Sequence, residues 1–134
     1  MSKTILAVDD SASMRQMVGV TLRAAGYEVI EASDGDEALE YARKHRVDLV
    51  LTDVNMPRMD GITLIAQLRT LPGYHLTPLL LLTTESSPDR KIQGKQAGAT
   101  GWMVKPFNPD QLLATLERVL GNQTAVRSSA ARSG

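Results

Sequence analysis

The 134-residue chain contains no cysteine, which excludes a disulfide framework, a thiolate metal site and a cysteine nucleophile. It has no excess charge of either sign, because fifteen basic residues balance fifteen acidic ones. We therefore expect no direct binding to nucleic acid or to an anionic membrane surface. No apolar run approaches the ~20 residues of a membrane span, and the apolar stretch near the N-terminus is too short for a signal peptide. These absences lead us to expect a cytoplasmic, monomeric protein with one domain.

Five short apolar runs alternate along the chain with five segments of helical period. The runs cover residues 4–8, 28–32, 47–52, 78–83 and 101–104. The first, third and fourth are almost continuous in Val, Leu and Ile, as in strands that are covered on both faces. Helix starts are indicated at Asp34, 87–88 and 108–109, and helix ends at Gly26, 72–73 and Gly121.

This alternation predicts an α/β fold in which five parallel strands form a doubly wound sheet with helices on both faces. Residues 1–121 would make up this domain. Residues 122–134 lack periodicity and are rich in small polar residues, so we expect them to be a disordered C-terminal tail. In folds of this kind ligands bind beyond the carboxyl ends of the strands, which makes every residue at a strand end a candidate for the site.

Four of the five strand ends carry groups that suit phosphate and metal chemistry. The groups are three carboxylates, a hydroxyl and an ammonium, contributed by Asp9, Asp10, Asp53, Thr83 and Lys105. Each alone has an ordinary explanation: a helix cap for Asp10, a turn residue for Asp53, a strand former for Thr83 and a solvated charge for Lys105. If the first and third strands are neighbours, however, the three carboxylates approach one another and repel.

A divalent cation would relieve this repulsion, and oxygen ligands without histidine or cysteine favour Mg²⁺. An aspartate, a cation and a lysine together suit the attack of a carboxylate oxygen on phosphorus, which forms an acyl phosphate. The cation and the lysine would neutralise the charge on the transferring oxygens.

The residues Asp9-Asp10, Asp53 within DVNMPRMDG, Thr83 and Lys105-Pro106-Phe107 resemble the receiver domain of two-component response regulators. The resemblance covers residues from about 3 to 121, and it implies a flavodoxin-like (β/α)5 fold with strand order 2-1-3-4-5. It also implies that Asp53 accepts a phosphoryl group from a sensor histidine kinase. Mg²⁺ would be bound by Asp9, Asp10, Asp53 and the backbone carbonyl of Asn55, the 105–106 peptide bond would be cis, and Thr83 and Lys105 would contact the phosphoryl oxygens.

Three further positions follow from the same resemblance. Asn55 and Glu85 would flank the acyl phosphate and influence the attacking water, and this pair looks like the stand-alone chemotaxis regulators. A solvated loop acid is the alternative for Glu85. Trp102 stands where the family carries a switch aromatic residue, and a static, surface-packed tryptophan is the alternative. An effector, with the flagellar motor switch as one candidate, would dock on the face formed by the fourth helix, fifth strand and fifth helix, where Lys91 and Lys95 add positive charge.

The leading hypothesis is thus a phosphorylation-activated switch that catalyses only its own phosphorylation and dephosphorylation. A phosphate sink or phosphorelay intermediate without an effector of its own is the alternative. A Mg²⁺-dependent phosphatase with an aspartate nucleophile is disfavoured, because such enzymes carry DxDx[TV] after the first strand and this chain carries DDSAS.

Overall fold

The computed structural model describes residues 3–84 and 88–133, with side chains described as far as Gly121. Five strands alternate with five helices, as the sequence pattern predicts. The strands are β1 Thr4–Val8, β2 Glu28–Ala32, β3 Leu49–Asp53, β4 Leu79–Thr83 and β5 Gly101–Val104. The helices are α1 Ala12–Ala24, α2 Gly35–Lys44, α3 Gly61–Leu68, α4 Pro88–Ala97 and α5 Pro109–Ser133.

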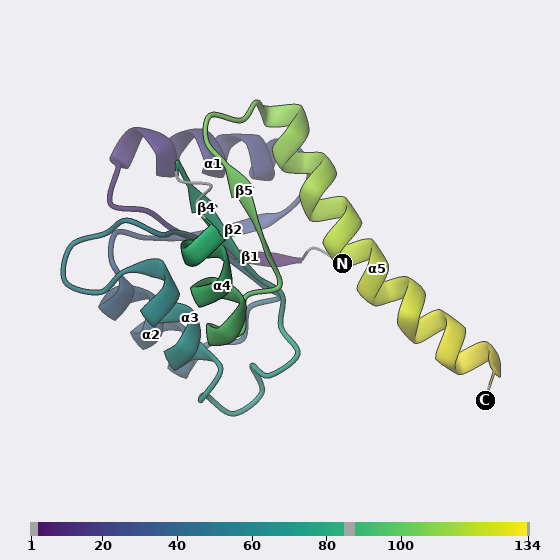
Figure 1. The fold of residues 1–134 in the computed structure, drawn as a ribbon. Helices are drawn as coiled ribbons and strands as arrows, with labels where there is room; N and C mark the ends of the chain where they lie inside the picture. The colour runs from purple at the N-terminus through teal and green to yellow at the C-terminus, as the bar shows by residue number, and fades with distance from the viewer. Residues whose placement is uncertain (1–2, 85–87, 134) are drawn as a thin grey trace.

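The strands form one parallel sheet in the order β2-β1-β3-β4-β5, which confirms the expected fold class and strand order. Helices α1 and α5 cover one face of the sheet, and α2, α3 and α4 cover the other (Figure 1). Because β1 and β3 are neighbours at the centre, with Val8 opposite Thr52, their carboxyl ends lie side by side.

Two apolar clusters hold the layers together, one on each face. Alternate residues of the central strands belong to alternate clusters: Leu6 and Val50 pack with α2 and α3, whereas Ile5 and Leu49 pack with α1 and α5. All four side chains are fully buried. Burial of a side chain of this size stabilises the fold by about 1.5–3 kcal/mol before conformational entropy is subtracted.

The signals at the helix ends act largely as predicted. Asp34 accepts a hydrogen bond from the backbone N–H of Glu37 at 2.8 Å and so caps α2. Asn108 and Gln111 exchange side-chain bonds with each other's backbone N–H, both at 2.8 Å, at the start of α5. Gly26 follows α1 with a φ of 98°, which glycine adopts without strain.

The end predicted for the last helix at Gly121 is wrong, because α5 continues to Ser133. Gly121 does not adopt the positive φ of a glycine that ends a helix. A glycine inside a helix costs only about 1 kcal/mol relative to alanine, and no proline follows Gly121 to stop the helix. The division of the chain into a domain of residues 1–121 and a tail of residues 122–134 stays a prediction. Within the described residues, no helix is both long enough and apolar enough to cross a membrane.

Candidate functional site

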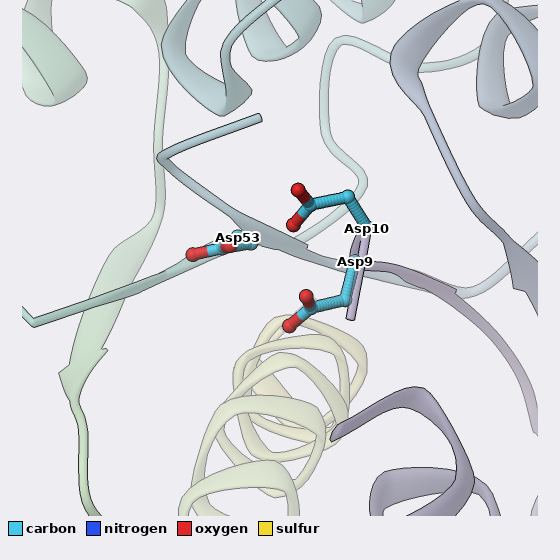
Figure 2. A group of neighbouring side chains, drawn as sticks. All are labelled: Asp9, Asp10 and Asp53. Atoms are coloured by element: carbon cyan, nitrogen blue, oxygen red, sulfur yellow. The ribbon is translucent and has the colours of Figure 1, made fainter. Parts of the chain in front are cut away.

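Three carboxylates meet at the carboxyl edge of the sheet (Figure 2). Asp9 and Asp10 directly follow β1, and Asp53 is the last residue of the neighbouring strand β3. The three side chains each offer an oxygen, and these oxygens all lie within 4.8 Å of one another. The convergence predicted from the sequence is therefore present.

The two acids after β1 have different environments. Asp9 is 3% exposed, and its Oδ1 accepts a hydrogen bond from the backbone N–H of Ser11 at 2.9 Å. Asp10 is exposed and does not cap α1, because the hydroxyl of Ser11 accepts the bond from Met14 N at 3.3 Å. The Asp10 carboxylate has no hydrogen-bond partner among the described residues, so it can serve as a ligand.

Lys105 joins the acids from the other side of the site. Its Nζ lies 3.3 Å from Oδ2 of Asp9 and 3.3 Å from Oδ1 of Asp53. The peptide bond between Lys105 and Pro106 is cis, as expected from the family resemblance. One ammonium therefore faces three carboxylates, which leaves an excess of negative charge within the site.

The surroundings of Asp53 raise the pKa of its carboxyl group above the ordinary value of 3.8. Burial is the largest cause, because it disfavours the charged form, and the charge of Asp9 acts in the same direction. Lys105 and a hydrogen bond from the Asn55 backbone oppose the rise without cancelling it. The ionised form of Asp53 is thus stabilised incompletely by the protein itself.

The donor set fits Mg²⁺. It consists of carboxylate oxygens, which a small hard cation prefers, and the exposed Asp10 leaves one side open to the water ligands that Mg²⁺ usually retains. A cation bound beside Asp53 would also oppose the rise in the pKa of its carboxyl group, because a nearby positive charge favours the ionised form.

The remaining predicted site residues lie around this centre. Thr83 is the last residue of β4 and is 5% exposed; with Trp102, Lys91, Arg90 and others it lines a cavity of about 10 Å³. Trp102 is partly buried in β5, and Nζ of Lys91 lies 5.1 Å from its ring centroid. Asn55 is exposed two residues after Asp53. Glu85 lies outside the described residues.

Two contacts with the site were not predicted from the sequence. Gly61 begins α3 directly against the backbone of Asp53, and a Cβ at this position would overlap the Asp53 carbonyl oxygen. Arg15 donates from Nη1 to the backbone carbonyl of Asp9 at 2.6 Å. The Asp60-Gly61 pair reads in sequence as ordinary turn chemistry, and the only signal for Arg15 is its spacing from Gly19 and Arg23.

The parallel sheet thus carries an acidic cluster and a bridging lysine at the carboxyl ends of its central strands. The model of the response regulator receiver domain matches residues 5–117, and the chain belongs to this family. Receiver domains act as phosphorylation-dependent switches and bind Mg²⁺ at an acidic pocket.

Relatives with different overall architectures share this domain. The chain is 39% identical over 120 residues to the Bacillus subtilis alkaline phosphatase synthesis transcriptional regulatory protein PhoP, covering 90% of this chain but 49% of that protein. It is 39% identical over 119 residues to a chemotaxis protein CheY homologue of Campylobacter jejuni, covering 87% and 92%. The structure of Vibrio cholerae chemotaxis protein CheY4 is 55% identical, with a TM-score of 0.87 over 89% of this chain and 99% of that one. The chain is thus a CheY-like receiver domain, which spans about half the length of PhoP.

Proposed function

We propose that the chain is a phosphorylation-activated switch in which Asp53 accepts a phosphoryl group from a histidine kinase. The observation that supports this most directly is the placement of the Asp53 carboxylate within 3.3 Å of the Lys105 ammonium and beside two further acids suited to Mg²⁺. Phosphorylation of the chain itself accounts for this arrangement, without a separate substrate.

In the proposed reaction an oxygen of the ionised Asp53 carboxylate attacks the phosphorus of a phosphohistidine. The new P–O bond forms as the P–N bond breaks, and the departing imidazole takes up a proton. Asp9, Asp10, Asp53 and the carbonyl of Asn55 would hold Mg²⁺, which would supply charge neutralisation at the phosphoryl oxygens. Lys105 is already beside Asp53, so it can pair with a second phosphoryl oxygen without a large movement.

Three other side chains complete the proposal. The Thr83 hydroxyl would donate a hydrogen bond to the phosphoryl group, since β4 ends beside β3 with Leu82 opposite Asp53. Asn55 and Glu85 would flank the acyl phosphate and influence the water that hydrolyses it to aspartate and inorganic phosphate. Hydrolysis by this route returns the protein to its starting form.

Phosphorylation by a small donor tests this proposal. With Mg²⁺ and acetyl phosphate, mass spectrometry should show one added phosphoryl group on the wild-type chain and none on Asp53→Asn. Asp36→Asn, a change in the exposed first turn of α2, is the matched control and should accept the group normally. An adduct that persists in Asp53→Asn would refute the assignment of Asp53.

We further propose that the output surface is the face formed by α4, β5 and α5. A groove of about 440 Å³ lies there, bordered by Trp102, Phe107 and Arg118 among others. Ile92 and Val104 are exposed nearby, and Lys91 and Lys95 add positive charge. Apolar side chains beside cations suit a partner segment with both apolar and acidic residues.

Movement of Trp102 would link the site to this surface. In the unphosphorylated chain the Lys91 ammonium covers the indole ring, a contact worth about 0.5–1 kcal/mol at an exposed position. The cavity lined by Thr83 and Trp102 has room for about one water molecule, so we propose that an inward turn of the ring accompanies a movement of Thr83.

The emission of Trp102, the single tryptophan, reports this movement. Beryllofluoride with Mg²⁺ should change the emission of the wild-type chain, and Thr83→Val should largely abolish the change while beryllofluoride still binds. An unchanged wild-type spectrum at saturating beryllofluoride would remove Trp102 from the switch.

We assign the switch to chemotaxis because the similarity to CheY4 extends over nearly the whole of that protein. A CheA-like kinase would then be the donor and a motor-switch protein the effector. The alternative, a phosphate sink or relay, predicts phosphorylation without a change in exchange protection on the α4–β5–α5 face. Hydrogen exchange with and without beryllofluoride distinguishes the two.

A further inference from the structure

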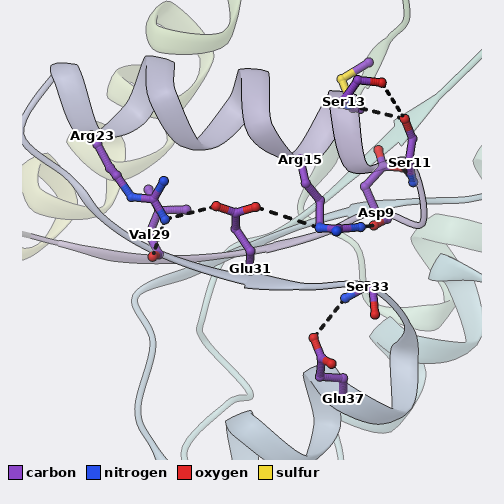
Figure 3. Close-up of polar contacts among 10 residues, drawn as sticks. Asp9, Ser11, Ser13, Arg15, Arg23, Val29, Glu31, Ser33 and Glu37 are labelled. Carbon is purple, nitrogen blue, oxygen red and sulfur yellow. Dashed lines mark hydrogen bonds and ion pairs between the residues drawn. The ribbon is translucent and has the colours of Figure 1, made fainter.

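The backbone of Asp9 is held by hydrogen bonds from two sides, one at its N–H and one at its carbonyl. The Asp9 backbone N–H donates to the Ala32 carbonyl at 3.1 Å, which continues the pairing with β2. The Asp9 carbonyl accepts from Nη1 of Arg15 at 2.6 Å. Arg15 lies near the start of α1, so its side chain reaches back to the end of β1 (Figure 3).

The peptide between Asp9 and Asp10 carries the Cα from which the Asp10 carboxylate extends. Asp10 is exposed, and its side chain has no hydrogen bond with any described residue. The described contacts act on this carboxylate through the backbone, because the planar Asp9–Asp10 peptide fixes the Cα of Asp10 relative to the carbonyl that Arg15 holds. The bond from Arg15 is the contact on the Asp9 carbonyl, and it adds to the bonds that hold the Asp9 N–H and the Ser11 N–H on either side of Asp10.

Arg15 is itself held by an acid on β2. Oε1 of Glu31 lies 3.8 Å from Nε of Arg15, and Oε2 lies 3.1 Å from Nη2 of Arg23 (Figure 3). Nη2 of Arg23 also donates to the Val29 carbonyl at 3.2 Å. Glu31 thus lies between two arginines of α1 and ties both to the edge strand.

The sequence of α1 makes room for this acid. Arg15, Gly19 and Arg23 are spaced by four residues and lie on one face of the helix. A Cβ at Gly19 would lie 3.0 Å from Oε2 of Glu31 and 2.9 Å from Nη1 of Arg23. A glycine at this position costs about 1 kcal/mol relative to alanine, and its effect here is to let the carboxylate lie against the helix between the arginines.

We propose that Arg15 is a positioning residue for the Mg²⁺ site, and that Glu31, seated over Gly19, holds Arg15 in the conformation that orients Asp10. This inference rests on the proposed function, because it assumes that the acidic cluster binds Mg²⁺. Residues that orient metal ligands in this way typically contribute 10–100-fold to metal affinity.

Electrostatics alone predicts the opposite result, which makes the idea easy to test. Removal of a positive charge beside the acids should strengthen the binding of a cation if Arg15 acts only through its charge. Loss of positioning should weaken binding. The direction of the change in affinity therefore identifies the role.

The experiment is a calorimetric titration of the full chain with Mg²⁺ at fixed ionic strength. Arg15→Gln should weaken binding about tenfold. The matched control is Arg43→Gln, which makes the same charge change on the exposed last turn of α2 and should leave the affinity near the wild-type value. Equal or tighter binding by Arg15→Gln would overturn the proposal.

A second variant covers the case in which Arg15→Gln does not fold. Glu31→Gln keeps the arginine but weakens its anchor, and it should reduce Mg²⁺ affinity more than Glu28→Gln, a neutralisation of an exposed acid on the same strand. Equal effects of the two changes would count against a role for the Glu31 anchor.

Phosphorylation kinetics add a readout that separates affinity from chemistry. Arg15→Gln should be slow with acetyl phosphate at low Mg²⁺ and recover at saturating Mg²⁺, whereas a deficit that persists at saturation would contradict the proposal. A wild-type chain that binds no Mg²⁺ would refute the proposed function. A wild-type chain that binds Mg²⁺ with the same affinity as Arg15→Gln would refute only the role of Arg15.

Discussion

The carboxylate of Asp53 lies among groups with opposing effects on its charge. Burial and Asp9 favour the protonated form, whereas Lys105 and the Asn55 backbone favour the ionised form, and the net result is a raised pKa. The protein therefore stabilises the ionised form of Asp53 incompletely, and a cation bound beside it would favour that form.

The raised pKa leads to a prediction about stability. Between the ordinary value of 3.8 and the higher folded value, the native state binds more protons than the unfolded chain. Stability contributed by Asp53 therefore falls as pH rises through this window, and the full penalty remains above the folded pKa. Asp53→Asn should consequently raise the free energy of unfolding at neutral pH in the absence of divalent cations.

Urea unfolding in a chelating buffer measures this effect. The gain from Asp53→Asn should be largest near neutrality and should disappear below the ordinary pKa of an aspartate. Asp36→Asn, at an exposed position, should show little gain at any pH. A wild-type chain that is more stable than Asp53→Asn at neutral pH would show that Lys105 outweighs burial.

The residues of the site differ in how far the sequence reveals them. Asp9, Asp10, Asp53, Thr83 and Lys105 could be found because strand ends are visible as limits of apolar runs, and parallel strands bring these ends to one edge. Arg15 and Gly61 could not, because their roles depend on the reach of one side chain and on the close approach of two backbones. Neither property leaves a periodic signal.

Among the structural elements, the end of α3 has an unusual connection to its neighbours. Arg69, just after α3, uses all five of its N–H donors. Four bonds reach the backbone carbonyls of Tyr74, Thr77 and Gly98, and the fifth reaches the hydroxyl of Thr100 at 3.5 Å. One guanidinium therefore joins the loop before β4 to the loop before β5.

Arg69→Ala should lower the free energy of unfolding by about 2 kcal/mol, because several partly buried carbonyls lose charge-assisted hydrogen bonds. Arg69→Lys should recover little of this loss, since one ammonium cannot reproduce the planar fork. Arg43→Ala removes an exposed arginine whose ion pair with Glu40 is 3.9 Å long, and it should change stability by less than about 0.5 kcal/mol. Chemical denaturation of the three variants gives the comparison.

At the level of elements, apolar patterns and capping residues predicted the order and type of every helix and strand. They predicted the first and last residue of each element less accurately. β3 begins at Leu49, two residues after the predicted start, and at Asp48 the carboxylate, in place of a backbone carbonyl, accepts the bond from Thr4 N at 2.7 Å. Local signals specify where an element can stop, whereas contacts with other parts of the chain decide where it does.

In the whole molecule, the sheet separates two apolar cores that draw on alternate residues of the same strands. Their existence follows from the continuous apolar runs, which predict strands covered on both faces. Which helices cover which face does not follow from any single run, because it depends on the handedness of the crossovers and on the strand order.

Apolar residues on both faces of β1 and β3 also have a consequence for alignment. A shift of one strand by a single residue would exchange its two faces. Because both faces are apolar, burial alone penalises such a change of register only weakly. Asp9 and Asp53 add a penalty, because a shift that moves the carboxyl end of either strand inward would place a carboxylate in the interior of the sheet. The acids at the ends of β1 and β3 thereby help to fix the alignment of the two strands, and a chain that lost them would keep its apolar strands but lose this penalty against a shifted register.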